Sequence, residues 1–263
     1  MAQQSFRHEG FCVGPVTPME PNGDVRLESI QAYSDHLLAS GVNGLFLNGT
    51  CAEGLSMTVA ERKSLAEKWI SVGRGKYDKI IVHCGALSLR DARELATHAE
   101  AIGADAISAV PSFYFVPHDE RTNESHRGVG VSGPQNSLIY YHNPGRTHVS
   151  VDMALFIPTR KDPHPHFCRH QMAASDLAGL LRCKALHGDS IALMWANDDH
   201  SRRLQAWDTA GAAREHYLKT VWIQRMDERK TMAAASQGNP GVPDWHPHWS
   251  GAFAASSADR CGY

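Results

Sequence analysis

An α/β fold is predicted by three features of this sequence. Apolar runs of strand length alternate with amphipathic segments of helix length, an order that requires parallel strands joined by right-handed crossovers. The length of 263 residues, 42% of them hydrophobic, suits one large core and the size of a single barrel. A small turn with a hydroxyl group follows an early apolar run, in the place where β/α enzymes bind anions. We therefore expect a TIM (β/α)8 barrel.

The alternation is clearest in the N-terminal part of the chain. Segment 88–102 is a predicted helix with Ser88 as its N-cap, Asp91 placed to complete a capping box, and Gly103 just past its end. Strands are predicted at 11–19, 42–48 and 79–85, helices at 27–40, 58–72, 88–102 and 176–186, and further apolar runs at 106–111, 137–142, 151–157 and 191–195. This order is that of successive βα units.

Three stretches, at 118–136, 160–171 and 201–263, interrupt the pattern. They are rich in His, Arg, Pro, Gly and Ser, and they fall where a barrel needs its fourth helix, its sixth strand, and its seventh helix with its eighth strand. Loops of more than about 15 residues without structure are uncommon in a compact domain. We therefore expect a barrel domain over residues 1–200, incomplete or distorted around strands 6 and 8, and an irregular segment over 201–263, for which disorder is one interpretation.

Composition narrows the class of function. The net charge is -2 and no run is rich in Lys or Arg, which argues against nucleic acid as a partner. No apolar run approaches the roughly 20 residues that span a bilayer, so no membrane partner is expected. The first residues lack a secretory pattern, which predicts a cytoplasmic protein with reduced thiols. The six cysteines and sixteen histidines lack metal-ligand spacing, so neither a metal nor a cofactor is expected.

A carboxylate-binding loop is indicated after the second predicted strand, by the run Asn48-Gly49-Thr50-Cys51-Ala52-Glu53-Gly54-Leu55-Ser56. Backbone N–H groups and a threonine hydroxyl before a helix attract an anion. A Gly-Thr turn before a helix is also common as a simple cap, so the local pattern leaves both interpretations open.

Ordered blocks along the chain carry a family resemblance. They are Thr17-Pro18-Met19 with Asn22-Gly23, the turn 48–56, Glu61-Arg62, His83-Cys84-Gly85-Ala86-Leu87-Ser88-Leu89, Ile102-Gly103-Ala104-Asp105, Tyr140-Tyr141-His142-Asn143-Pro144, Ser175-Asp176-Leu177 and Trp195-Ala196-Asn197-Asp198-Asp199. Together they resemble the N-acetylneuraminate lyase family of pyruvate-dependent class I aldolases, which also includes dihydrodipicolinate synthase. Blocks 54–56 and 85–88 look like the animal-type lyase pattern, which favours the sugar-acid lyase.

The resemblance implies a chemistry. Family lyases cleave N-acetylneuraminate reversibly into N-acetylmannosamine and pyruvate, through a Schiff base on a barrel lysine. They are commonly homotetramers or dimers, and the implied partners are a sugar acid and pyruvate. Thr50 would bind the substrate carboxylate, and Cys51, in place of a second hydroxyl, would be a weaker donor. Ala52 replaces a glycine, a change that matters if the backbone there has positive φ.

Further site residues follow from the same resemblance. Tyr141 matches the tyrosine of the family's Tyr-X-X-Pro turn, whose phenol relays protons, although a tyrosine at a strand end can also simply pack with its hydroxyl on a carbonyl. Asp198 and Asp199 match an acidic pair that binds sugar hydroxyls, or they form an ordinary turn.

The imine-forming lysine is absent from its expected position. Counting from Tyr141 and from block 175–177, the family's Gly-X-Lys strand falls on residues 169–171, so Gln171 occupies the lysine position. An amide forms no imine. Lys161 lies in an irregular stretch and Lys184 in a predicted helix, so neither is placed to line the barrel. We expect this chain to lack the covalent chemistry.

A shifted reading frame would explain this loss. Arg169-His170-Gln171-Met172 can be encoded by CGG CAT CAA ATG, and the same bases, followed by G and shifted by one, encode Gly-Ile-Lys-Trp. We hypothesise that 118–136, 160–171 and 201–263 are frame-shifted translations between in-frame blocks. Three interpretations stay open: a corrupted copy of an active sugar-acid lyase, an inactive homologue that binds a keto acid or sugar acid, and a non-functional product.

Overall fold

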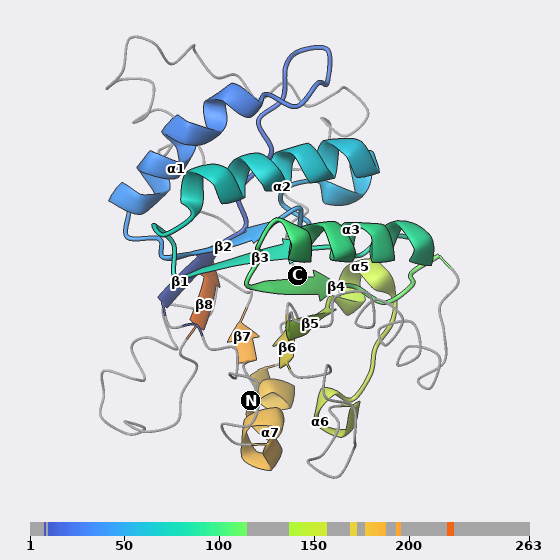
Figure 1. Ribbon diagram of the computed structural model, residues 1–263. Helices are drawn as coiled ribbons and strands as arrows, with labels where there is room; N and C mark the ends of the chain where they lie inside the picture. The colour runs from blue at the N-terminus through green and yellow to red at the C-terminus, as the bar shows by residue number, and fades with distance from the viewer. Residues whose placement is uncertain are drawn as a thin grey trace.

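The computed structural model describes residues 8, 10–114, 137–156, 169–172, 177–187, 193–195 and 220–223. Within these ranges, eight parallel strands pair in chain order as a closed barrel. The strands are β1 (Gly10–Val13), β2 (Gly44–Leu47), β3 (Lys79–His83), β4 (Ala106–Ala109), β5 (Ser137–His142), β6 (Arg169–Met172), β7 (Leu193–Trp195) and β8 (Thr220–Ile223), as Figure 1 shows. The predicted TIM barrel is confirmed.

The barrel wall is uneven around its circumference. Strands β5 and β6 share four registered residue pairs, as do β8 and β1. Between β7 and β8 there is a single pair, Trp195 with Val221. The distortion predicted around the eighth strand corresponds to this narrow seam.

Two of the irregular stretches contribute strands. Strand β6 includes the end of stretch 160–171, and β8 lies beyond the predicted domain boundary at residue 200, so the barrel extends into 201–263. The sequence of β8, Thr-Val-Trp-Ile, consists of β-branched and aromatic residues suited to a strand. Stretch 118–136 and the remainder of the other two lie outside the described residues.

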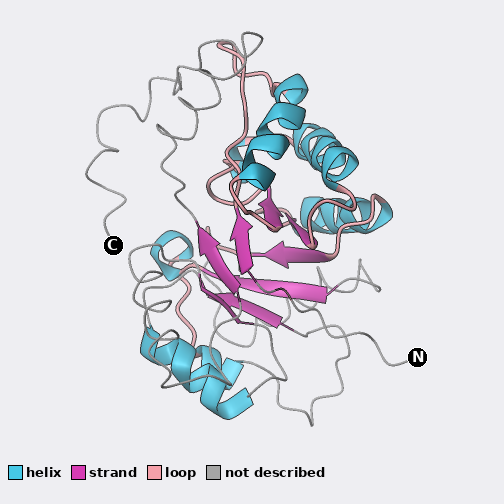
Figure 2. Ribbon diagram, turned by 90° about the vertical axis from the view of Figure 1, so that its left-hand side faces the viewer, coloured by secondary structure: helices cyan, strands magenta, loops and turns pink. Residues whose placement is uncertain are grey.

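Helices cover the barrel wall on two sides. The longer ones are α1 (Ile30–Ala39), α2 (Val59–Gly73), α3 (Leu89–Ala101) and α7 (Leu177–His187), and the short ones are α5 (Pro144–Thr147) and α6 (Met153–Phe156), with 3-10 turns η1 (Leu27–Ser29) and η2 (Gly54–Ser56). The group α1, α2 and α3 lies on one side of the strands, and α6 with α7 on the opposite side (Figures 1 and 2). None of the helices described here is both long and apolar enough to cross a membrane.

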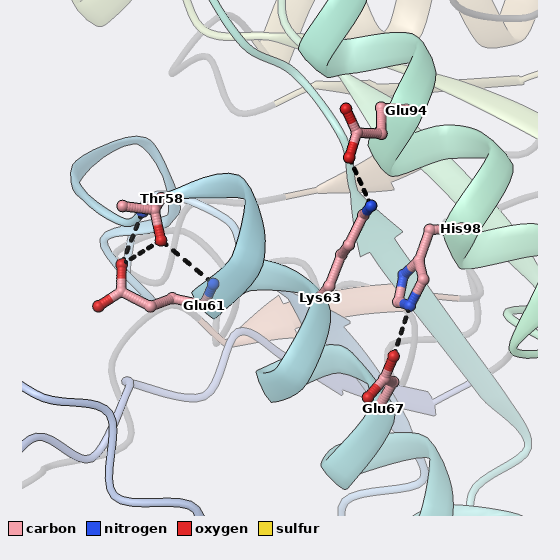
Figure 3. A network of polar contacts seen from close by, with 6 residues as sticks. All are labelled: Thr58, Glu61, Lys63, Glu67, Glu94 and His98. Atoms are coloured by element: carbon pink, nitrogen blue, oxygen red, sulfur yellow. Dashed lines mark hydrogen bonds and ion pairs between the residues drawn. The ribbon is translucent and has the colours of Figure 1, made fainter.

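Local signals set the helix ends. Thr58 caps α2 in a complete capping box, in which its hydroxyl accepts from the Glu61 N–H at 3.2 Å and its own N–H donates to Glu61 Oε2 at 2.7 Å (Figure 3). Ser88 caps α3 by accepting from the Asp91 N–H, one half of the predicted box, and Gly103, with φ of 85°, follows its end as predicted. The first strand, predicted to reach residue 19, ends at Val13 because Pro15 has no N–H for a ladder.

An ion pair and a histidine–carboxylate hydrogen bond join α2 to α3 at the surface. Lys63 Nζ lies 2.6 Å from Glu94 Oε1, and His98 Nε2 lies 2.7 Å from Glu67 Oε1 (Figure 3). The carboxylates are exposed, so each pair adds less than about 1 kcal/mol. The apolar core therefore holds these helices in place.

Buried side chains form two layers. The outer layer, between the strands and α1–α3, contains Leu45, Leu47, Leu65, Trp69 and Val82. The inner layer fills the barrel with Cys12, Phe46, Ile81, Ala106, Ile139, Tyr141 and Met194. Successive residues of a strand point to opposite faces, so β2, covered on both, is buried at every position.

Candidate active site

Two predicted site residues meet at the carboxyl ends of the strands. Thr50 follows β2 and Tyr141 lies near the end of β5, and the Thr50 Oγ1 and Tyr141 hydroxyl oxygens are 3.3 Å apart. Strands β2 and β5 are not neighbours in the barrel. The two hydroxyls therefore meet across its mouth, the place where TIM barrels carry their sites.

The turn that carries Thr50 is held by its own backbone. The Glu53 N–H donates to the Thr50 carbonyl and the Gly54 N–H to the Gly49 carbonyl, each at 3.1 Å. A Cβ added at Gly54 would overlap the carbonyl of Asn48. Glycine is therefore required at 54 for close backbone approach.

The expectation about Ala52 needs correction. The non-glycine residues of this turn with positive φ are Asn48 (58°) and Glu53 (54°), and Ala52 is not one of them. Ala52 is 2% exposed, and its carbonyl accepts from Thr17 Oγ1 at 2.6 Å. An alanine there brings no backbone strain. Cys51 is a partly exposed cysteine in the same turn.

Tyr141 is fully buried, and its hydroxyl has side-chain partners. The ring packs edge-on against Phe46 and His83, with centroids 5.7 Å apart in each pair. Besides Thr50, the hydroxyl has Asn143, whose Nδ2 donates to it at 3.4 Å. The ring of Tyr141 therefore packs in the core while its hydroxyl makes polar contacts.

His83, not predicted as a site residue, packs against Tyr141, and the polar Ser108 lies beside His83. His83, at the end of β3, is 2% exposed, and its Nδ1 lies 3.4 Å from Oγ of the buried Ser108 on β4. The sequence did carry a signal for His83. It belongs to one of the blocks that resemble the family, and it lies two residues from Ile81, whose side chain points into the barrel. The contact between His83 and Ser108 depends on the register of β3 with β4, which no local sequence pattern predicts.

A buried arginine fixes the end of β3. Arg62 of α2 is 2% exposed and donates to the carbonyls of His83, at 2.7 Å, and Gly85, at 3.0 Å. Burial lowers the pKa of its guanidinium, and burial raises the pKa of the Cys84 thiol between those carbonyls to about 12. The guanidinium thus donates through its two terminal nitrogens to neutral carbonyls, and these hydrogen bonds tie α2 to the strand that presents His83.

The remaining candidates are placed only in part. Gln171 pairs in register with Tyr141 of β5 and Met194 of β7, two residues whose side chains pack inside the barrel. Lys184 is half-buried on α7, outside the strands. Asp198, Asp199 and Lys161 lie outside the described residues. Within the described ranges, no three His, Cys, Asp or Glu side chains gather as metal ligands.

Fold and site together define a (β/α)8-barrel protein with hydroxyl groups gathered at the carboxyl ends of its strands. Residues 7–201 match the dihydrodipicolinate synthetase family, and the chain belongs to it. The predicted family is thereby confirmed.

Two relatives are N-acetylneuraminate lyases. The chain is 32% identical over 242 residues to N-acetylneuraminate lyase of Mus musculus, covering 89% of this chain and 76% of that protein. It is 38% identical over 177 residues to the Gallus gallus lyase, covering 66% of this chain and 58% of that protein. It therefore spans little more than half the length of the chicken relative.

Solved structures agree with the fold. N-acetylneuraminate lyase from Proteus mirabilis superposes with a TM-score of 0.73 at 28% identity, covering 82% of this chain and 70% of that one. The sialic acid aldolase from Aliivibrio salmonicida gives 0.75 at 26% identity, covering 88% and 75%.

Proposed function

We propose that this chain is an N-acetylneuraminate lyase-like barrel that binds a keto acid or sugar acid and does not form the imine needed to cleave it. One observation carries the proposal: in a chain of this family, Thr50 Oγ1 and the Tyr141 hydroxyl lie 3.3 Å apart at the carboxyl ends of the barrel strands. The partner is a small molecule. The expectations of a cytoplasmic location and of no metal, cofactor or nucleic acid stay predictions.

Carboxylate binding is supported by the chemistry of the two hydroxyls. Each can donate to an anion, and a dry, preorganised donor stabilises charge more than water does. Tyr141 is fully buried, which fixes its phenol in one place. Thr50 and Tyr141 then bind the acid end of the ligand, and Cys51 contributes a weaker donor from the same turn. Asp198 and Asp199 stay candidates for sugar hydroxyls.

Loss of the covalent step is supported by strand register. Family chemistry needs a lysine whose amine attacks the keto carbon, and position 171 between Tyr141 and Met194 is the one that sequence counting assigns to it. A carboxamide nitrogen is not nucleophilic, so Gln171 cannot take over. The ligand then binds as a free acid.

Borohydride trapping tests the proposal. We expect the purified chain, incubated with pyruvate and sodium borohydride, to show no adduct by intact mass, and Gln171→Lys to show one pyruvate reduced onto the protein. Gln31→Lys adds a lysine on the exposed face of α1 and serves as the matched control, with no adduct. An adduct in the unaltered chain would mean that another lysine, such as Lys161, supplies the imine.

A second candidate function rests on the codon pattern. Residues 169–172 can be encoded by CGG CAT CAA ATG, and these bases, followed by G and shifted by one, encode Gly-Ile-Lys-Trp, so an active lyase whose sequence is frame-shifted here is the alternative. Sequencing of the coding DNA decides it: compensating insertions or deletions near 117, 160 and 200 support the alternative, and an uninterrupted gene refutes it.

We also propose that the chain forms a homo-oligomer, with the tetramer as first expectation. Four large apolar side chains are exposed in the segments that follow β2, β3 and β4: Leu55, Leu87, Leu89 and Tyr114. Burial against a second copy would remove this surface from water. Sedimentation at several concentrations measures the state, and a monomer throughout would contradict the proposal.

A further inference from the structure

Asn143 follows β5 at the N-cap of α5, yet its side chain does not cap the helix. The N3 donor is satisfied by the main chain instead: the Asn143 carbonyl accepts from the Arg146 N–H at 3.1 Å, besides the Thr147 N–H at 2.9 Å. Asparagine at an N-cap ordinarily accepts from the first turn through its side chain. The side chain of Asn143 is therefore committed elsewhere.

That side chain lies in the candidate active site. Asn143 is 3% exposed, and its Nδ2 donates to the Tyr141 hydroxyl at 3.4 Å. Its Oδ1 is buried and has no hydrogen-bond partner among the described residues. A buried acceptor without a donor is costly, and such a group at a binding site is explained when the ligand supplies the donor.

We propose that Asn143 is a specificity-determining residue, whose Oδ1 accepts a hydrogen bond from a hydroxyl group of the bound acid. This inference rests on the proposed function, namely that the site binds a keto acid or sugar acid. Carboxylate and keto oxygens are acceptors only and cannot satisfy Oδ1. A hydroxyl can, so the site prefers a hydroxylated keto acid over the same acid without that group.

The site offers hydrogen-bond donors at one end and an acceptor at the other. Because Asn143 donates to the phenol oxygen, the proton of Tyr141 is directed away, toward Thr50 or the ligand. Thr50 and Tyr141 thus offer donors for a carboxylate, and Oδ1 offers an acceptor for a hydroxyl. Sites built to bind a hydroxyl discriminate strongly against analogues that lack it.

The test compares two acids that differ by one hydroxyl, 2-oxobutanoate and 4-hydroxy-2-oxobutanoate, by titration calorimetry on the full chain. We expect the hydroxylated acid to bind about 10-fold or more tighter. In Asn143→Leu, which keeps side-chain size, the two affinities should fall within about 2-fold because the acceptor is gone. The surface variant Asn22→Leu should keep the preference.

Each other outcome has a meaning. Equal affinities in the unaltered chain, or a preference that survives in Asn143→Leu, overturn this inference alone. Tighter binding of 2-oxobutanoate overturns it too. Absence of binding of either acid overturns the proposed function with it. If Asn143→Leu does not unfold cooperatively, Asn143→Ala, which also lacks the acceptor and fits in the same space, takes its place.

Discussion

The two halves of the barrel are built differently. Strands β1 to β4 pack against α1, α2 and α3, helices of ten to fifteen residues, through one extended apolar layer, and side chains cap α2 and α3. Strands β5 to β8 complete the wall by pairing, and the helix described beyond α5 and α6 is the single eleven-residue α7. Thr50 comes from the first half and Tyr141 from the second. Among the described residues, the site therefore joins a half with an extended apolar helix layer to a half that consists of paired strands with the shorter helices α5, α6 and α7.

A matched pair of core deletions tests this difference. Leu65 on α2 and Leu180 on α7 are each 1% exposed, but only Leu65 belongs to the extended outer layer. We expect Leu65→Ala to lower the free energy of unfolding by about 4 kcal/mol and Leu180→Ala by about 2 kcal/mol, because cost grows with the cavity left in a packed surrounding. Urea unfolding measures both, and equal losses would remove the distinction between the halves.

The next largest effect is expected at Arg62, which joins α2 to the site end of β3. Arg62→Met should destabilise the chain by about 3 kcal/mol, because two carbonyls lose donors from a charged group. The adjacent Lys63→Met is the control and should cost about 0.5 kcal/mol, since its ion pair is at the surface. Similar losses in the two variants would mean that the buried guanidinium is not a structural tie.

A smaller effect is expected where the halves meet. Thr50→Val removes the hydroxyl near Tyr141 and keeps side-chain shape, and we expect pyruvate affinity to fall about 10-fold, the value of one hydrogen bond to a charged group. Thr97→Val, on the exposed side of α3, should leave the affinity within about 2-fold. Calorimetric titration gives both numbers, and unchanged affinity in Thr50→Val would place the carboxylate elsewhere.

The helix starts of the first half could be predicted from sequence, and the last strand of the second half could not. Helix α3 begins after Ser88, its predicted N-cap, and α2 begins one residue after its predicted start at Thr58, because a helix start is a signal local to a few residues. Strand β8 was missed because four residues without surrounding periodicity carry no such signal, and barrel closure is a property of the whole wall.

Some site residues were predicted from sequence and others were not. Thr50 and Tyr141 were predicted by resemblance, and their hydroxyls meet. The polar contacts of His83 and Asn143 were not predicted, since they arise from strand register and from a main-chain cap that frees a side chain. Sequence reasoning placed Gln171 by counting, and register gives it a place between two inward residues.

The smallest effect concerns the local signal that starts α2. Thr58→Ala should cost about 1 kcal/mol at neutral pH, because the N3 amide loses its acceptor. The hydrogen bond from the Thr58 side chain, and then that from its N–H, lower the pKa of the Glu61 carboxyl below 4.5. A lowered acid pKa stabilises the fold above the ordinary value, and this contribution is lost as pH falls through the folded-state pKa.

The difference in stability between parent and Thr58→Ala should therefore narrow at acid pH, by a few tenths of a kcal/mol because Glu61 lies near the surface and is screened. Glu61→Gln can keep the reciprocal bond without a charge, so in that background the cost of Thr58→Ala should not change with pH through this group. Thermal unfolding from pH 7 to pH 3 provides the comparison. A pH-independent cost in both backgrounds would mean that the hydroxyl alone starts the helix, and that the charge of Glu61 adds nothing to the better-packed half of the barrel.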